Sequence, residues 1–198
     1  MVLWALAYLG DAGAQTPTIV IYGDSLSAGY GLARGTGWVD LLGKRLSQQN
    51  YPYRLVNASI SGETSLGGKN RIAKVLALHR PAIVVLELGA NDGLRGHPNG
   101  SLKANLGSIV RACQRSGARV LLVGMRLPPN YGAAYTREFS QTFAATAKQH
   151  NLPLVPFLME GFAQRREMFQ SDGVHPNAQA QPAMLDTVWN ALAPMLKK

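Results

Sequence analysis

Ser25, Asp172 and His175 are the side chains whose types and spacing could carry out covalent chemistry. Ser25 follows the apolar run of IVIYGDSLSAGYG at 19–31, and Asp172 and His175 stand three residues apart in QSDGVHPNAQA. A serine hydroxyl is a weak nucleophile near neutral pH and needs an adjacent base that a third group orients. We therefore predict Ser25 as a nucleophile, His175 as its base and Asp172 as the carboxylate that orients the imidazole.

Acyl transfer by a serine also requires hydrogen-bond donors aimed at the oxyanion that develops on the substrate carbonyl. The sequence offers candidates in SISGET, which contains Gly62, and in ELGANDGL, which contains Asn91. We predict an oxyanion hole formed by the backbone N–H groups of Ser25 and Gly62 and by the side-chain amide of Asn91. Removing one side-chain donor of this kind lowers kcat by roughly 10² to 10³.

Each of these residues also has a structural interpretation. A serine after a strand is often a helix N-cap or turn former, and asparagine and glycine favour turns. Asp172 could cap the last helix, and the other histidines, His79, His97 and His150, are expected on surfaces or at helix ends. The joint presence of a nucleophile, a base, an orienting carboxylate and oxyanion donors favours the catalytic interpretation.

Asp24 and Asp92 invite interpretation as a carboxylate pair, and Asp92 with Asp172 and His175 could form a metal site. No recurring metal-ligand motif surrounds them in the sequence, so we expect no metal and no other cofactor. We expect both aspartates to hold turns by accepting hydrogen bonds from nearby backbone N–H groups.

Short apolar runs bounded by glycine or proline alternate with longer helical patterns along the chain. The runs are rich in Val, Ile and Leu without alternation, which is typical of strands covered on both faces. The predicted strands are residues 18–22, 53–58, 83–88, 119–125 and 154–157. The predicted helices are about 37–49, 65–79, 101–116, 135–149 and 178–196, and in the first of them Trp38, Leu41, Leu42 and Leu46 share one face.

The alternation of strands and helices implies one parallel sheet, because each parallel crossover needs a connecting helix. Right-handed crossovers place helices on both faces. We therefore predict an α/β fold, a three-layer α/β/α sandwich of the flavodoxin-like kind, with five parallel strands in the order 2-1-3-4-5. Ligands bind such sheets at the carboxyl ends of the strands, near the point where the strand order reverses. Ser25, Gly62 and Asn91 follow the first three predicted strands, so this edge would bring them together.

The composition indicates one ordered domain. The chain has 198 residues, of which 46% are hydrophobic and 16% charged, and this suits a single core. Its net charge of +9 is spread without runs longer than two basic residues, so we expect no nucleic-acid partner. Cys113 is the only cysteine and is expected to be a buried apolar side chain. We expect a monomer.

Four short blocks occur in chain order: GDSL at 23–26, the glycine of SGET at 61–64, GAND at 89–92 and DGVHP at 172–176. Together they resemble the four blocks of the SGNH or GDSL-type hydrolases. The longer strings NASISGET, ELGANDGLRG, RLPPNYG and DGVHPNAQAQP are similar to the bacterial thioesterase I, arylesterase and lysophospholipase branch of that family. The resemblance runs from about residue 18 to the C-terminus.

This resemblance implies the same catalytic and oxyanion residues as the argument above. It also implies a mobile substrate loop at 93–98, in which Gly93 and Leu94 contact the substrate, and an acyl-side contact from Leu127 and Pro128. These apolar residues are consistent with an acyl-binding groove.

We predict a serine hydrolase that cleaves carboxylic esters or acyl thioesters through an acyl-enzyme, with a small-molecule substrate that carries an acyl chain. The sequence leaves open the choice among thioesters, aryl esters and lysophospholipids. The alternative is a flavodoxin-like nucleotide- or flavin-binding protein. GETSLGGKN at 62–70 is superficially similar to a phosphate-binding loop, but Lys69 stands seven residues after Gly62 where six are required, and Asn70 replaces the usual Ser or Thr.

The N-terminal segment MVLWALAYLGDAGAQTP has an apolar stretch from Val2 to Leu9 and small residues that end at Ala14. This pattern resembles the end of a secretory signal with cleavage before Gln15, although the usual positive residues ahead of it are missing. An ordinary hydrophobic N-terminus is the alternative. We expect residues 1–14 to be an incomplete signal peptide, residues 15–198 to be one hydrolase domain, and the protein to be periplasmic or secreted in a bacterium. The apolar stretch is too short for stable membrane insertion.

Overall fold

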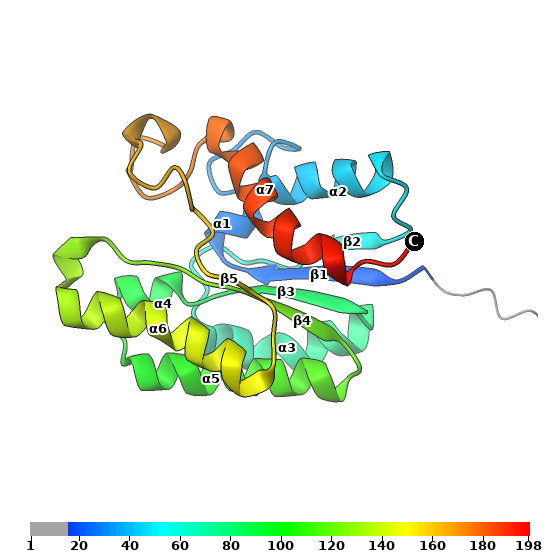
Figure 1. Ribbon diagram of the computed structural model, residues 1–198, viewed down its shortest axis with the longest axis horizontal. Helices are drawn as coiled ribbons and strands as arrows, with labels where there is room; N and C mark the ends of the chain where they lie inside the picture. The colour runs from blue at the N-terminus through cyan, green and yellow to red at the C-terminus, as the bar shows by residue number, and fades with distance from the viewer. Residues whose placement is uncertain (1–15) are drawn as a thin grey trace, which may run out of the picture.

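The computed structural model describes residues 16–198, which build a five-stranded parallel sheet between two layers of helices (Figure 1). The strands lie in the order β2-β1-β3-β4-β5, and each neighbouring pair is parallel. The predicted fold class and strand order are therefore confirmed. The strands are β1 (Thr18–Gly23), β2 (Arg54–Asn57), β3 (Ile83–Glu87), β4 (Arg119–Val123) and β5 (Leu154–Val155).

The two central strands, β1 and β3, are buried along their whole length. Helices cover both of their faces, which explains why their sequences are apolar without alternation. Their register pairs Gly23, the last residue of β1, with Glu87, the last residue of β3. A buried glutamate therefore lies beside the turn that follows β1.

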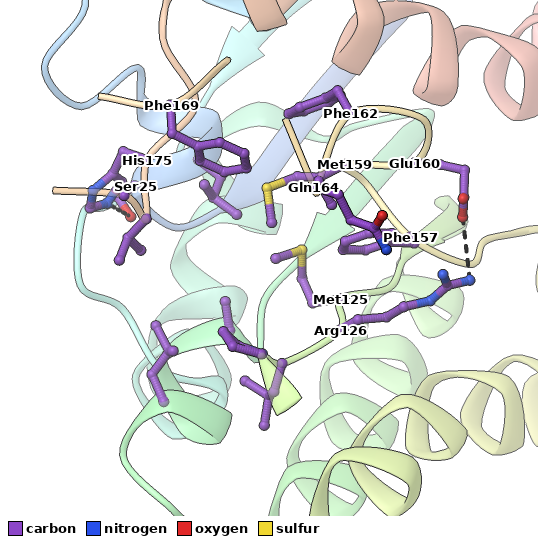
Figure 2. Close-up of a pocket in the computed structure, with 18 of the residues that line it drawn as sticks. Ser25, Met125, Arg126, Phe157, Met159, Glu160, Phe162, Gln164, Phe169 and His175 are labelled. Atoms are coloured by element: carbon purple, nitrogen blue, oxygen red, sulfur yellow. Dashed lines mark hydrogen bonds and ion pairs between the residues drawn. The ribbon is translucent and has the colours of Figure 1, made fainter. Parts of the chain in front are cut away.

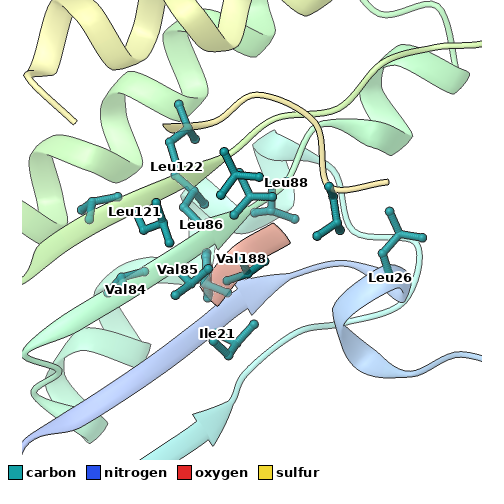
Figure 3. Packing of buried hydrophobic residues seen from close by; sticks show 14 of the residues in the cluster. Ile21, Leu26, Val84, Val85, Leu86, Leu88, Leu121, Leu122 and Val188 are labelled. Carbon is teal, nitrogen blue, oxygen red and sulfur yellow. The ribbon is translucent and has the colours of Figure 1, made fainter. Parts of the chain in front are cut away.

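Helices cover both faces of the sheet. α2 and α7 pack together on one face, and α3, α5 and α6 lie on the other (Figure 1). Ile21 of β1, Val85 of β3 and Val188 of α7 belong to one buried cluster, part of which is seen in Figure 3. The long helices are α2 (Trp38–Gln48), α3 (Ser65–His79), α5 (Asn99–Arg115), α6 (Ala133–His150) and α7 (Gln181–Leu192).

The buried faces of these helices agree with the patterns in the sequence. Trp38, Leu42 and Leu46 of α2 are buried, and Leu41 packs partly buried against the core. Cys113 of α5 is fully buried, and its burial raises the thiol pKa to about 12. The thiol is therefore neutral and packs as a small apolar side chain, as predicted.

The ends of several elements differ from the sequence prediction. Four of the five strands end one or two residues early, and two unpredicted short helices begin just after central strands. These are α1 (Ser25–Ala28), after β1, and α4 (Ala90–Leu94), after β3. Helices of four or five residues are too short to show an apolar period, so the sequence pattern could not predict them. The predicted last helix is divided, because 3₁₀ turns at Ala178–Ala180 and Ala193–Met195 flank α7.

The predicted signal-peptide segment, residues 1–14, lies outside the described residues. Within residues 16–198, the structure contains no helix with the length and apolar character needed to cross a membrane.

Candidate active site

Ser25 is positioned by the turn at the carboxyl end of β1. It is the first residue of α1, and Asp24 caps this helix, because Asp24 Oδ1 accepts a hydrogen bond from the backbone N–H of Leu26 at 3.0 Å. The helix ends after one turn at Gly29, which adopts a left-handed conformation. Ser25 therefore lies on a sharp strand-to-helix corner, and Asp24 holds this turn as predicted.

The side chains of Ser25, His175 and Asp172 form a continuous chain of contacts. Ser25 Oγ lies 3.0 Å from His175 Nε2, and His175 Nδ1 lies 2.7 Å from Asp172 Oδ2. The structure thus brings together the three residues that the sequence analysis selected. With the Nδ1 proton donated to Asp172, the lone pair of Nε2 faces the serine hydroxyl.

Asp172 is held by backbone donors as well as by the imidazole. Its Oδ1 accepts hydrogen bonds from the backbone N–H groups of Val174 at 2.9 Å and His175 at 3.0 Å. The bond from the His175 backbone, followed by those from its ring and from Val174, lowers the pKa of Asp172 to about 2. Asp172 lies in a turn and does not cap the last helix, since Asn177 caps the 3₁₀ turn before α7.

Tyr30 and Gln170, which the sequence analysis did not select, support the histidine. The Tyr30 ring packs on the imidazole with centroids 4.6 Å apart. Gln170 Nε2 donates to the Tyr30 carbonyl at 2.8 Å, and the Gln170 backbone N–H donates to the His175 carbonyl at 2.8 Å. These contacts join the segment after α1 to the loop that carries His175.

Asn91 lies in α4 and lines the same pocket as Ser25 and His175. Its side-chain amide donates to Asp24 Oδ2 and to the backbone carbonyl of Glu63, both at 3.0 Å. Asn91 thus joins the turns that follow β1 and β2, and both of its amide protons are engaged. An oxyanion must share or replace one of these bonds to be bound by Asn91.

Gly62 lies in the turn after β2 with a φ of +78°, a left-handed conformation that glycine adopts without strain. Arg95, directly after α4, donates from Nη2 to the Gly62 carbonyl at 3.1 Å. Within residues 16–198, the backbone N–H groups of Ser25 and Gly62 have no hydrogen-bond acceptor. Both groups are therefore able to donate to an oxyanion.

Asp92 does not hold its own turn, so that prediction is wrong. Its two carboxyl oxygens accept hydrogen bonds from the backbone N–H of Ser65 at 2.7 Å and from the Ser65 hydroxyl at 2.6 Å. Asn105 of α5 donates to the same hydroxyl at 3.1 Å. The first N–H groups of a helix lack partners within the helix, and Asp92 satisfies one of them at the start of α3. Asp92 on α4 is therefore linked to α3 directly and to α5 through the Ser65 hydroxyl.

A pocket of about 680 Å³ opens beside Ser25 and His175 (Figure 2). Leu94, Leu127 and Pro128, which the sequence resemblance implies as substrate contacts, line this pocket. Gly93 does not line it. This glycine is buried, and a Cβ there would lie 2.7 Å from Leu127 Cδ2 and 2.6 Å from Phe139 Cε2. Gly93 therefore allows Leu127 to pack closely and does not itself face the pocket.

Much of the apolar wall comes from residues that the sequence analysis missed. Figure 2 shows them between the pair of Ser25 and His175 and an ion pair at the other end of the pocket, where Arg126 Nη2 lies 3.3 Å from Glu160 Oε2. Most of them follow β5 at its carboxyl end, so the rule that located Ser25 could have located them too. The main apolar side chains are Met125, Phe157, Met159, Phe162 and Phe169.

The segment 62–70, which is superficially similar to a phosphate-binding loop, enters α3 at Ser65. Lys69 and Asn70 are exposed residues inside this helix and belong to no loop that could wrap a phosphate. The nucleotide- or flavin-binding alternative is therefore not favoured.

A serine that meets a carboxylate-bound histidine at the carboxyl edge of a three-layer α/β sandwich, next to an apolar pocket, is the arrangement of a serine hydrolase of acyl compounds. The comparison of sequences makes the class more specific. The chain belongs to the GDSL-like lipase/acylhydrolase family, which it matches over residues 21–182.

Similar proteins of this family are bacterial enzymes. Esterase TesA of Pseudomonas aeruginosa is 49% identical over 183 residues, which cover 92% of this chain and 91% of that protein. Thioesterase 1/protease 1/lysophospholipase L1 of Escherichia coli is 39% identical over 191 residues, which cover 96% of this chain and 90% of that protein. A crystal structure of TesA matches with a TM-score of 0.89 and 50% identity, over 90% of this chain and 99% of that one. The present chain is accordingly an enzyme that hydrolyses ester bonds.

Proposed function

We propose that this enzyme hydrolyses carboxylic esters and acyl thioesters, with Ser25 as the nucleophile, His175 as the general base and then acid, and Asp172 as the orienting group. The observation that carries this assignment is the chain of contacts from Ser25 Oγ to His175 Nε2 at 3.0 Å and from His175 Nδ1 to Asp172 Oδ2 at 2.7 Å. With its pKa lowered to about 2, the Asp172 carboxylate is charged near neutral pH and stabilises the imidazolium that forms.

The reaction begins when Ser25 Oγ attacks the carbonyl carbon of the substrate while His175 Nε2 takes the hydroxyl proton. The carbonyl oxygen becomes an oxyanion, which accepts hydrogen bonds from the backbone N–H groups of Ser25 and Gly62 and from the Asn91 amide. His175 then gives its proton to the leaving alcohol or thiol. The bond between the acyl carbon and the leaving group breaks, and the acyl group remains on Ser25.

Water releases the acyl group by the same steps in the second half of the reaction. His175 Nε2 removes a proton from water, and the resulting oxygen nucleophile attacks the acyl carbon. His175 returns the proton to Ser25 Oγ as the carboxylic acid leaves. The site residues thereby return to their starting protonation states.

The proposed substrates carry an acyl chain that occupies the apolar pocket beside Ser25. The lining by leucine, methionine and phenylalanine supports this class, and the names of the relatives cover esters, thioesters and lysophospholipids. We expect kcat/KM for p-nitrophenyl esters to rise from acetyl to longer acyl groups. Leu127→Ala should reduce kcat/KM for the longer esters more than for the acetyl ester. Equal kcat/KM at all lengths would contradict this assignment.

Labelling with a fluorophosphonate tests the nucleophile. We expect the probe to modify Ser25 in the purified enzyme, as read by mass spectrometry of the labelled peptide, and to leave Ser25→Ala unmodified. Ser116→Ala serves as a matched control, because this serine lies at the end of α5 and donates to the Cys113 carbonyl. No labelling in the wild type, combined with no hydrolysis of p-nitrophenyl esters, would rule out the proposed mechanism.

The proposed location is the periplasm or the medium, after cleavage before Gln15, and the proposed state is a monomer. The location is supported by the apolar and small residues of MVLWALAYLGDAGA, and the relatives described above are bacterial. Cell fractionation followed by N-terminal sequencing tests the location. Light scattering of the purified domain, residues 15–198, tests the monomeric state.

A further inference from the structure

Glu87 is a fully buried carboxyl beside the nucleophile, and the proposed mechanism gives it no task. It ends β3 opposite Gly23 of β1, so it lies next to the turn that carries Ser25. A buried carboxyl is costly unless it is well paired or neutral. The position of Glu87 therefore requires an explanation.

One oxygen of Glu87 holds the chain on both sides of Ser25. Oε2 accepts a hydrogen bond from the backbone N–H of Asp24 at 3.3 Å and another from the Ser27 hydroxyl at 2.7 Å. A Cβ on Gly23 would collide with this oxygen and would lie 2.8 Å from Ser27 Oγ. Glycine at this position allows the contact, and the contact fixes the residues that flank the nucleophile.

The other oxygen, Oε1, is buried and has no hydrogen-bond partner within residues 16–198. Asp24 is equally buried, but both of its oxygens accept hydrogen bonds, Oδ1 from the Leu26 backbone and Oδ2 from the Asn91 amide. Hydrogen bonds to a carboxylate favour its charged form. A single negative charge in this pair therefore resides on Asp24, and Glu87 is the neutral partner.

The surroundings of Glu87 support this division of charge. Burial, followed by the charge of Asp24, raises the pKa of Glu87 well above its ordinary value. Burial also raises the pKa of Asp24, to about 6, but the hydrogen bonds from the Leu26 backbone and the Asn91 amide lower it, as does His175, while Asp92 on α4 raises it. Ser27 of α1, the remaining polar side chain against Glu87, is uncharged.

We propose that Glu87 is a positioning residue that works as a neutral carboxylic acid behind the nucleophilic turn. Because Glu87 is protonated, Asp24 carries the only charge of the pair and holds Asn91. The hydrogen bond between Glu87 and Ser27 persists, because a hydroxyl can both donate and accept. Loss of the proton puts two negative charges together in a fully buried site, so the turn or the contact to Asn91 must shift. The inference rests on the proposed function, since the direction of Ser25 matters only if it is the nucleophile.

Glu87→Gln tests the proposal, because glutamine resembles the neutral acid in shape and cannot ionise. A carboxyl whose pKa is raised by folding contributes stability that is fully present below its unfolded pKa and is lost as pH rises toward its folded pKa. The free energy of unfolding of the wild type should therefore fall, relative to that of Glu87→Gln, as pH rises through this interval. Glu138→Gln, on the exposed side of α6, is the matched control and should follow the wild-type curve.

Activity gives a second readout. At neutral pH, kcat of Glu87→Gln should stay within about threefold of the wild type, and it should persist to higher pH. Glu87→Asp withdraws the carboxyl by one methylene, and a misplacement of about 1 Å should lower its kcat by roughly 10² with little change in KM. A folded Glu87→Gln that loses more than roughly 10² in kcat at neutral pH would show that the charge is needed and would overturn the proposal.

Infrared spectroscopy reports the protonation state without any substrate. We expect a protonated-carboxyl band at neutral pH in the wild type that is missing in Glu87→Gln and displaced in Ser27→Ala, which loses the hydrogen-bond partner. Parallel stability curves for the wild type and Glu87→Gln, or a wild type without the band, would also overturn the proposal that Glu87 is neutral. If Glu87→Gln does not fold, the presence of the band in the wild type and its displacement in Ser27→Ala test the proposal instead. A failed fluorophosphonate label would remove the proposed function but leave these spectra unchanged.

Discussion

The effect of Asn91→Ala follows from the contacts that Asn91 makes in the free enzyme. A side-chain oxyanion donor contributes about 2.7 to 4 kcal/mol to catalysis. Both amide protons of Asn91 are already engaged, and the bond to the charged Asp24 is the stronger one, so an oxyanion displaces the Glu63 carbonyl. Giving up that bond costs about 0.5 to 1.5 kcal/mol. The net loss in Asn91→Ala centres on about 2.3 kcal/mol, or roughly 50-fold in kcat.

Steady-state kinetics with a short-chain ester measures this loss, and we expect it in kcat with little change in KM. Denaturant unfolding should show a separate loss of about 1 to 3 kcal/mol, because the buried Asp24 carboxylate loses a donor. Asn105→Ala is the control, because this asparagine bonds Ser65 away from the oxyanion and should lower stability without lowering kcat. If Asn91→Ala kept kcat within about twofold on every active substrate, the backbone N–H groups alone would bind the oxyanion and the assignment of Asn91 would be wrong.

Four further outcomes are expected. Asp172→Asn should lower kcat by up to about 10⁴, because an amide at this place favours the wrong imidazole tautomer, and a circular dichroism spectrum like that of the wild type would exclude misfolding. Only neutral His175 can accept the serine proton, so kcat/KM should fall on acidification, and a profile flat from about pH 5 to 8 would contradict the base assignment. Because the pKa of Asp172 is lowered to about 2, its contribution to stability is present above the unfolded pKa and is lost as pH falls toward 2. Acid titrations of unfolding should therefore show the wild type losing its advantage over Asp172→Asn in this range. Gly62→Ala places a Cβ in a left-handed conformation at a cost of about 1 to 2 kcal/mol, and both the unfolding midpoint and kcat should fall.

The proximity of Ser25, Gly62 and Asn91 could be predicted from the sequence because each of them follows a strand with a strong apolar pattern. The parallel sheet brings the carboxyl ends of β1, β2 and β3 to one edge. The predicted strand order was therefore enough to place Ser25, Gly62 and Asn91 close together. His175 was found through its spacing from Asp172, although the spacing arises from a turn and not from a helix.

The missed features depend on contacts between distant segments. Asp92 bonds Ser65 across two elements, and no local pattern around either residue indicates such a pair. The pocket residues after β5 lie in an irregular stretch, where periodicity carries no information, so only their place after the carboxyl end of a strand could have indicated them. Glu87 lies near the end of the predicted apolar strand 83–88, and the sequence does not indicate what it contacts. Its place beside Gly23 follows only from the register of β1 and β3.

The residue types of the GDSL motif at 23–26 follow from its contacts with Glu87, Asn91 and the pocket. Gly23 is glycine because a side chain there would collide with the Glu87 carboxyl. Asp24 is an acid because one oxygen caps α1 through the Leu26 N–H while the other holds Asn91, and an amide in its place could accept only one of these bonds. Leu26 is apolar because it is buried at the wall of the pocket. The residues around Ser25 therefore fix the backbone that aims its hydroxyl at the histidine, and each of them is set by a group from another strand, helix or turn.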